Sequence, residues 1–125
     1  MKKVVTTQNA PAAIGPYSQA IEINGMLFAS GQIPLDPKTG TLVEGDIKAQ
    51  ARQALTNVKS LVESAGYSLS NFVKTTCFLA DMNDFAAFNE VYADFFEHEA
   101  PARSAVAVKS LPKNALCEVE VIAVL

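Results

Sequence analysis

Residues 101–120 of the chain are P-A-R-S-A-V-A-V-K-S-L-P-K-N-A-L-C-E-V-E. Two apolar runs flank a Pro-Lys-Asn loop in this stretch, a pattern that predicts two β-strands, over 103–109 and 116–124. Each run carries a charged residue, Arg103 in the first and Glu118 in the second. We expect the two strands to be neighbours in one sheet, so that Arg103 and Glu118 lie together and the rest of the chain holds them in place.

On the N-terminal side of this stretch, predicted strands and helices follow one another. Strands are expected over 3–7, 18–23, 26–30 and 72–80, and helices over 47–65 and from 81–84 to about 97. Asn24-Gly25 is a typical two-residue hairpin turn. Asp46 and Gly66 are a typical N-cap and a typical C-terminal stop for the first helix.

The buried and exposed faces of these elements follow from their periodicity. In the first helix, five polar residues outside the apolar stripe are expected to face solvent: Lys48, Gln50, Arg52, Gln53 and Lys59. In the second helix, which Asp81 or Asn83 is expected to cap, helical spacing predicts a core-facing stripe of Phe85, Phe88, Val91, Tyr92, Phe95 and Phe96. In the strand over 72–80, period two places four residues on one face: Val73, Thr75, Cys77 and Leu79.

These elements predict an α+β fold, with a single mixed β-sheet of about six strands and two helices on one face. The 125 residues are expected to form one domain, 1–125, because chains divide into domains only well above this size. The composition, 50% hydrophobic and 18% charged, is typical of a globular protein. The sheet face opposite the helices needs a cover, which a second copy of so short a chain can supply, so self-association is expected.

Charge and hydropathy argue against several classes of partner. The net charge of −3 is not the basic footprint of a dedicated nucleic-acid binder, so nucleic acid is not an expected partner. No apolar run approaches the roughly 18 residues of a membrane-spanning helix, so a membrane is not expected either. No apolar segment typical of a secretory signal follows the two N-terminal lysines, and a cytoplasmic location is therefore expected.

The sequence offers few ligands for a metal ion. Cys77 and Cys117 do not form a CxxC pair, and His98 is the only histidine. This set predicts neither a zinc site nor a disulfide; the cysteines are expected to be small core residues and His98 to be solvated. The chain also lacks a nucleophile elbow, a phosphate-binding loop and a dinucleotide-binding glycine motif, so no metal or organic cofactor is predicted.

Charged residues in the last two predicted strands are candidates for chemistry. The guanidinium of Arg103 presents a planar fork of donors that matches a carboxylate, although an arginine there can equally be a surface residue paired with an acid. Glu118 and Glu120 are expected on one strand face, about 6.6 Å apart along the strand. They are either solvent-facing acids or functional groups.

Two features of the N-terminal half are further candidates. The backbone N–H groups of Ser30 and Gly31, at the end of the predicted hairpin, can receive an anion or an oxyanion. Tyr17 follows Gly15-Pro16 in an irregular loop, where its ring either lines a pocket or packs on the protein.

Six blocks of the sequence, in order and with compatible spacing, resemble the Rid (YjgF) family, and most closely its RidA-type enamine/imine deaminases. The blocks are N-A-P at 9–11 with A-I-G-P-Y-S-Q at 13–19, S-G-Q-I-P at 30–34, Q-A-L at 53–55 with N-V at 57–58, V-K-T-T at 73–76, M-N-D-F at 82–85, and P-A-R-S at 101–104 with L-P at 111–112 and E-V-E at 118–120. The resemblance covers nearly the whole chain.

The resemblance implies a chorismate-mutase-like α+β fold, assembled as a homotrimer with three clefts between neighbouring subunits. It implies that Arg103 holds the carboxylate of a substrate and that Glu118 positions the hydrolytic water. Arg103 and Glu118 are expected to form one wall of the cleft, and another copy of the chain the opposite wall.

The same resemblance implies the residues that shape the pocket: Tyr17, Ser30, Gly31, Phe85 and Ala105. Ala105 departs from the family pattern, because many members carry cysteine two residues after the arginine. A mechanism that requires a thiol at this position is therefore not implied, whereas carboxylate binding and attack by water are.

The function that the resemblance implies is hydrolysis of reactive 2-enamino or 2-imino acids, such as 2-aminoacrylate, to 2-oxo acids and ammonia. An arginine clamp and a carboxylate beside a water suffice for this chemistry, without a metal, a Schiff-base lysine or an organic cofactor. One alternative is a non-catalytic regulatory module that binds small carboxylates through the same arginine. Another is an endoribonuclease or translation inhibitor, against which the acidity and the lack of a basic, aromatic strip argue.

Overall fold

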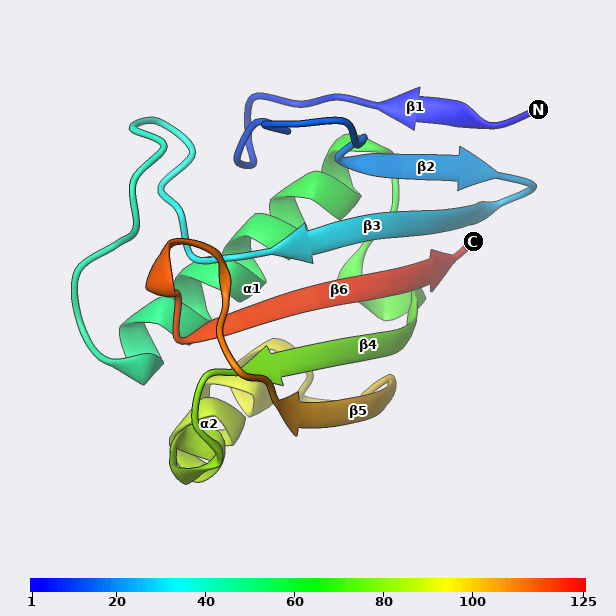
Figure 1. Cartoon of the computed structure of the whole chain (residues 1–125). Helices are drawn as coiled ribbons and strands as arrows, with labels where there is room; N and C mark the ends of the chain where they lie inside the picture. Colours follow the sequence, from blue (N-terminus) through cyan, green and yellow to red (C-terminus); the bar gives the residue numbers. More distant parts are fainter.

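A six-stranded β-sheet, covered on one face by two α-helices, forms the framework of the fold (Figure 1). The computed structural model describes all residues, 1–125. Its elements are β1 (Lys3–Val5), β2 (Ala20–Ile23), β3 (Met26–Gln32), α1 (Ile47–Ser64), β4 (Phe72–Leu79), α2 (Phe85–Phe95), β5 (Ala102–Ala107) and β6 (Cys117–Val124), with 3-10 turns η1 (Leu69–Asn71), η2 (Met82–Asp84) and η3 (Pro112–Asn114). The predicted α+β class, with one mixed sheet and two helices, is confirmed.

The last strand of the chain lies inside the sheet, whose order is β1-β2-β3-β6-β4-β5 (Figure 1). Neighbouring strands are antiparallel except β4 and β5, which are parallel. Parallel neighbours need a crossover connection, and α2 supplies it. Because β4 has β5 on one edge and β6 on the other, the prediction that Arg103 and Glu118 lie on neighbouring strands is wrong.

Local sequence determines the β2–β3 hairpin and both ends of α1. Asn24 and Gly25 have φ angles of 50° and 75°, as a two-residue turn between twisted strands requires. The side chain of Asp46 accepts a hydrogen bond of 3.1 Å from the N–H of Ala49 and caps α1. Gly66, with φ of 88°, ends the helix. These predictions are confirmed.

The second helix is shorter than predicted. Asp81 does act as a cap, but the turn that it caps through the N–H of Asn83, at 2.8 Å, is the 3-10 turn η2. The α-helix begins directly after this turn and ends at Phe95, before the predicted end at 97. Neither helix combines the length and the apolar character needed to cross a membrane.

The core lies between the sheet and the two helices. Alternate residues of β6 are buried there: Cys117, Val119, Val121 and Ala123. Cys77 and Cys117 are free and buried, and burial raises the pKa of their thiols to about 11 and about 12. The prediction that both cysteines are core residues is confirmed.

One residue of β4 lies on the other side of the sheet from its predicted place. The register between β4 and β6 shifts between Phe72 and Lys74. As a result Phe72 is buried in the core, and Val73 is 46% exposed on the opposite face of the sheet. A local irregularity of this kind interrupts the two-residue period on which the prediction was based.

Two buried side-chain amides of α1 bind backbone groups of two loops, one after β3 and one before β6. Gln50, predicted to face solvent, is buried instead, and its Oε1 accepts a hydrogen bond of 2.8 Å from the N–H of Leu116. Asn57 donates through Nδ2 to the carbonyls of Ile33 and Leu35, at 3.1 and 2.8 Å. These bonds fix the segment that follows β3 and the segment that precedes β6.

We predict that Asn57→Ala lowers the free energy of unfolding by about 1–3 kcal/mol, because the buried carbonyl of Leu35 loses its donor and the carbonyl of Ile33 keeps only the N–H of Leu35. Urea denaturation measures the change. Thr56→Ala, an exposed substitution on the same helix, is the control and should cost less than about 0.5 kcal/mol. Equal effects of the two substitutions would contradict the role given to Asn57.

Candidate functional site

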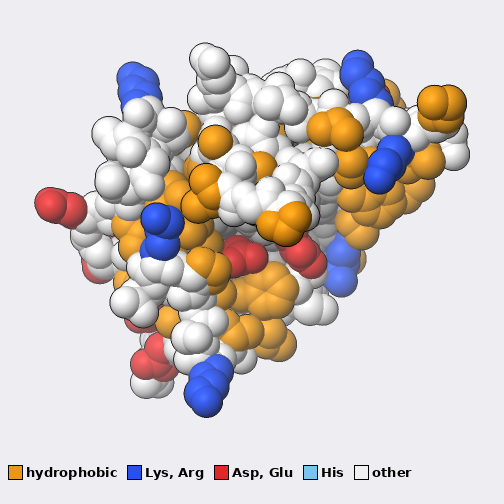
Figure 2. Space-filling model, turned by 45° about the horizontal axis from the view of Figure 1, so that its top comes forward, with side chains coloured by type: hydrophobic (Ala, Val, Ile, Leu, Met, Phe, Trp, Pro, Cys, Tyr) orange, Lys and Arg blue, Asp and Glu red, His pale blue; other side chains and the backbone are white.

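Four of the predicted site residues line one hollow: Tyr17, Ser30, Gly31 and Glu118. The hollow has a volume of about 510 Å³ and opens where β3 ends and β6 begins. The loop before β2, the loop after β3 and the turn η3 complete its walls. Figure 2 shows acidic side chains near the centre of this side of the molecule, between hydrophobic ones. The hollow thus combines carboxylates with apolar walls.

Gly31 makes room for the carboxylate of Glu118. The register between β3 and β6 shifts between Ala29 and Gln32, and Gly31 lies in this irregular part of the strand. A Cβ atom added to Gly31 would overlap Oε2 of Glu118 and crowd the rest of its carboxylate. A residue with a side chain at this position would therefore displace Glu118.

Ser30 holds the loop that carries Tyr17. Its hydroxyl donates to the carbonyl of Ser18 at 2.7 Å, and its backbone N–H donates to the carbonyl of Gln19 at 2.9 Å. The expectation that the N–H of Ser30 is free to receive an anion is therefore wrong. Tyr17 lies beside the hollow and is 48% exposed.

The buried amide of Gln19 fixes the other end of that loop, a role that the sequence did not predict. Its Oε1 accepts from the N–H of Thr7 at 2.8 Å, and its Nε2 donates to the carbonyls of Thr7 and Pro11 at 3.0 and 2.8 Å. Pro11 is itself part of the wall. An amide buried in an irregular segment satisfies backbone groups that have no ladder partner.

Arg103 lies outside this hollow, between β5 and α2. Its Nη1 donates to Oδ1 of Asn89 at 2.7 Å. Its guanidinium carbon lies 4.6 Å from the ring centroid of Tyr92 and 5.4 Å from that of Phe85, as in cation–π contacts. A second hollow, of about 340 Å³, opens beside Arg103 and is lined by Asn89 and Tyr92.

No acid neutralises Arg103. The ion pairs of the structure join Lys48 to Glu90 and Arg52 to Asp94, both between α1 and α2. The alternative that Arg103 is a surface arginine paired with an acid is therefore not observed. A guanidinium without a counter-ion, facing a hollow, has the charge and the donors that an anion such as a carboxylate requires.

Within one chain, Arg103 and Glu118 are on opposite faces of the sheet. Arg103 is in register with Thr75 of β4, and Glu118 is in register with Phe78. Successive residues of a strand point to opposite faces, so Thr75 and Phe78, which are three residues apart, face opposite ways. Arg103 and Glu118 lie beside them in register and therefore also face opposite ways. The expectation that Arg103 and Glu118 form one wall is therefore wrong for a single chain.

The remaining predicted residues lie with Arg103. Phe85, the first residue of α2, contributes one of the two rings beside the guanidinium. Ala105 is on the same side of β5 as Arg103, in register with Cys77, and packs against the core. The predicted residues are thus divided between two hollows.

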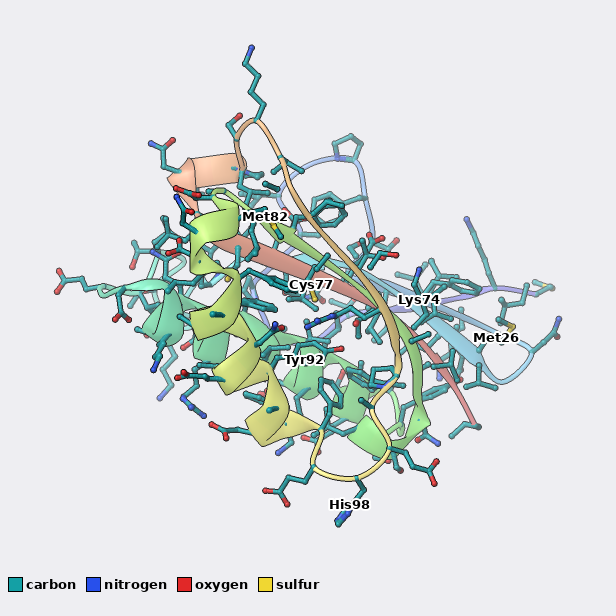
Figure 3. All side chains as sticks on the ribbon, turned by 90° about the horizontal axis from the view of Figure 1, so that it is seen from below. Met26, Lys74, Cys77, Met82, Tyr92 and His98 are labelled. Atoms are coloured by element: carbon teal, nitrogen blue, oxygen red, sulfur yellow. The ribbon has the colours of Figure 1, made fainter.

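Asn89 and a buried pair of side chains beneath Arg103 also belong to the site, although the sequence did not predict them. Thr75 Oγ1 and Tyr92 Oη are 2.7 Å apart in a hydrogen bond that fixes the Tyr92 ring. Figure 3 shows Tyr92 projecting from α2 on the side that faces the sheet. Asn89 follows Phe85 by four residues and precedes Tyr92 by three, so it lies on the aromatic face of the helix. A polar residue on this face was the feature of the sequence that could have indicated its role.

No group of three or more His, Cys, Asp or Glu side chains in the structure is arranged to hold a metal ion. His98 is exposed in the loop between α2 and β5, where Figure 3 shows it pointing away from the protein.

Comparison with known proteins assigns the family. The family model described as Endoribonuclease L-PSP matches residues 7–125. A RutC family protein of Pyrococcus horikoshii is 58% identical over 123 residues, which cover 98% of each chain. A 2-iminobutanoate/2-iminopropanoate deaminase of Salmonella typhimurium is 55% identical over 127 residues, which cover 99% of this chain and 98% of the relative.

Solved structures agree with this assignment. A protein of the conserved Rid family, YyfA from Yersinia pestis, superposes with a TM-score of 0.97 at 52% identity over all of both chains. E. coli TdcF with bound serine superposes with a TM-score of 0.93 at 50% identity over 98% of each chain. The chain belongs to the Rid (YjgF) family, as its sequence blocks predicted.

The hollow that holds Glu118 makes it a weaker acid than usual. Burial, and to a lesser extent the nearby charge of Glu120, raise the pKa of Glu118 above its ordinary value. The folded protein thus binds this proton more tightly than the unfolded chain does. The resulting contribution to stability is fully present below the unfolded pKa and is lost as the pH rises through the folded pKa.

We predict that Glu120→Gln lowers the pKa of Glu118 toward its ordinary value, because it removes the nearby negative charge. An NMR titration of the Glu118 side-chain carboxyl carbon in both proteins measures the shift. A pKa that is the same in the two proteins, or higher in Glu120→Gln, would contradict this description of the hollow.

Proposed function

We propose that this protein is a hydrolytic deaminase, which converts reactive 2-enamino and 2-imino acids such as 2-aminoacrylate to 2-oxo acids and ammonia. The observation that carries the proposal is the guanidinium of Arg103, which is held by Asn89 and two aromatic rings and has no acidic partner. A relative 55% identical over nearly the full length is named as a deaminase of such imino acids.

Arg103 is the group for the substrate carboxylate. With one Nη1 hydrogen directed at Asn89, the rest of the fork is left to form two parallel hydrogen bonds with a carboxylate. The reacting carbon of a 2-imino acid is bonded directly to that carboxylate. Binding at Arg103 therefore also fixes the position of the C=N bond.

Glu118 is the group for the proton transfers. Water adds to the C=N carbon as Glu118 accepts one of its protons and passes it to the imine nitrogen, which gives a tetrahedral carbinolamine. Glu118 then accepts the hydroxyl proton of the carbinolamine and passes it to the nitrogen; the C–N bond breaks as the C=O bond forms, and the products are a 2-oxo acid and ammonia. General acid–base help of this kind is worth about 10²–10⁴-fold. The raised pKa of Glu118 suits a group that must both accept and return a proton.

The proposed site needs two copies of the chain, because Arg103 and Glu118 lie on opposite faces of one sheet. We propose a homotrimer in which the hollow beside Arg103 of one subunit faces the hollow beside Glu118 of the next. Exposed hydrophobic residues support association, since Phe28 and Val106 are 40% and 46% exposed on the sheet face without helices. A ring of three such contacts closes on itself.

A second candidate function is binding of small carboxylates without turnover. The arginine site alone supports it, and the relative TdcF was solved with serine, an amino acid with a free carboxylate. Saturable binding of a 2-oxo acid by a protein that releases no ammonia from 2-aminoacrylate would favour this candidate. An RNA-directed activity would instead require binding that falls steeply with salt.

We predict that the protein releases ammonia and pyruvate from 2-aminoacrylate generated in situ, and that Arg103→Ala lowers kcat/KM by about 100-fold or more, because two charge-assisted hydrogen bonds are lost. Coupled assays of pyruvate and ammonia measure both. Arg52→Ala, which removes the arginine paired with Asp94, is the matched control and should leave the rate unchanged. Full activity in a folded Arg103→Ala protein would refute the proposed role.

A further inference from the structure

The side chains that accept a hydrogen bond from the guanidinium of Arg103 or place a ring beside it are uncharged. Asn89 accepts its hydrogen bond at 2.7 Å, and the rings of Tyr92 and Phe85 lie 4.6 and 5.4 Å from the guanidinium carbon. Tyr92 is held in turn by its hydroxyl contact with Thr75. Arg103 is thus fixed on three sides by groups that leave its charge intact.

Two other basic side chains that contact α2 form ion pairs with acids of this helix. Glu90, the next residue of α2, pairs with Lys48, and Asp94 pairs with Arg52. Acids of α2 thus pair with Lys48 and Arg52, whereas an amide of the same helix meets Arg103. Arg103 lines the hollow that opens beside Asn89 and Tyr92.

An amide and a carboxylate at position 89 would have opposite consequences for a ligand. Both accept the hydrogen bond from Nη1, and they have nearly the same shape. A carboxylate would also neutralise the guanidinium and compete with any bound anion, whereas the amide only orients it. The amide therefore fixes the long side chain before the ligand arrives and keeps its affinity for an anion.

We propose that Asn89 is a positioning residue, which orients Arg103 for a substrate carboxylate while leaving the positive charge of Arg103 uncompensated. The inference rests on the proposed function, because it assumes that Arg103 binds a carboxylate. It adds that the side chain at position 89 must be uncharged, a requirement that binding of the substrate by Arg103 does not in itself include.

The test is calorimetric titration of the full-length protein with pyruvate. We expect Asn89→Asp to weaken binding by about 10- to 100-fold, because the new charge competes with the ligand. The thermal unfolding midpoint should stay the same or rise, because the carboxylate keeps the hydrogen bond from Arg103 and adds an ion pair. Asn89→Ala, which removes the hydrogen bond and adds no charge, should weaken binding by less than Asn89→Asp does.

Asn83→Asp is the matched control, because it makes the same chemical change at an exposed position just before α2. It should leave pyruvate binding unchanged. Binding as tight in Asn89→Asp as in the unaltered protein would overturn the inference and leave the proposed function standing. Equal loss in Asn83→Asp and Asn89→Asp would also overturn it, since net charge would then be the cause. Absence of both pyruvate binding and 2-aminoacrylate turnover in the unaltered protein would overturn the proposed function and the inference together.

Discussion

The insertion of β6 between β3 and β4 is the constraint on which the rest of the structure depends. It buries alternate residues of β6 against the helices and leaves the residues between them on the opposite face. Glu118 therefore lies over Gly31 of β3, on the face without helices. The same insertion leaves β5 at the edge of the sheet, where Arg103 turns toward α2. One strand pairing thus separates the two residues that the proposed chemistry needs to combine.

Side-chain amides have a common role beside both hollows. Gln19, Gln50 and Asn57 each bind backbone groups of a segment beside the hollow of Glu118, and Asn89 binds the side chain of Arg103. A neutral amide can donate and accept, and it adds no charge to the site that we propose for a charged ligand. A rigid arrangement of few groups is adequate for hydrolysis of an imine, because its carbon is already electrophilic.

The sequence was sufficient for features that depend on neighbouring residues. The Asn24-Gly25 turn, the ends of α1 and the family blocks are of this kind. It was insufficient for features that depend on distant pairing. Periodicity cannot show that β4 separates β5 from β6, that a register shift exposes Val73, or that Gln50 meets the N–H of Leu116 across the core. The resemblance to the family named the candidate site residues, but the division of these residues between two faces follows only from the strand order.

The central claim is that Arg103 of one copy and Glu118 of another form one site, and mixing two inactive chains tests it most directly. Arg103→Ala and Glu118→Gln chains, co-expressed with different tags and purified as mixed assemblies, are assayed for release of ammonia from 2-aminoacrylate. In a trimer that contains both chains, one of the three sites combines an intact arginine with an intact glutamate, so about a third of the unaltered activity should return. Mixed assemblies as inactive as either parent would contradict the claim.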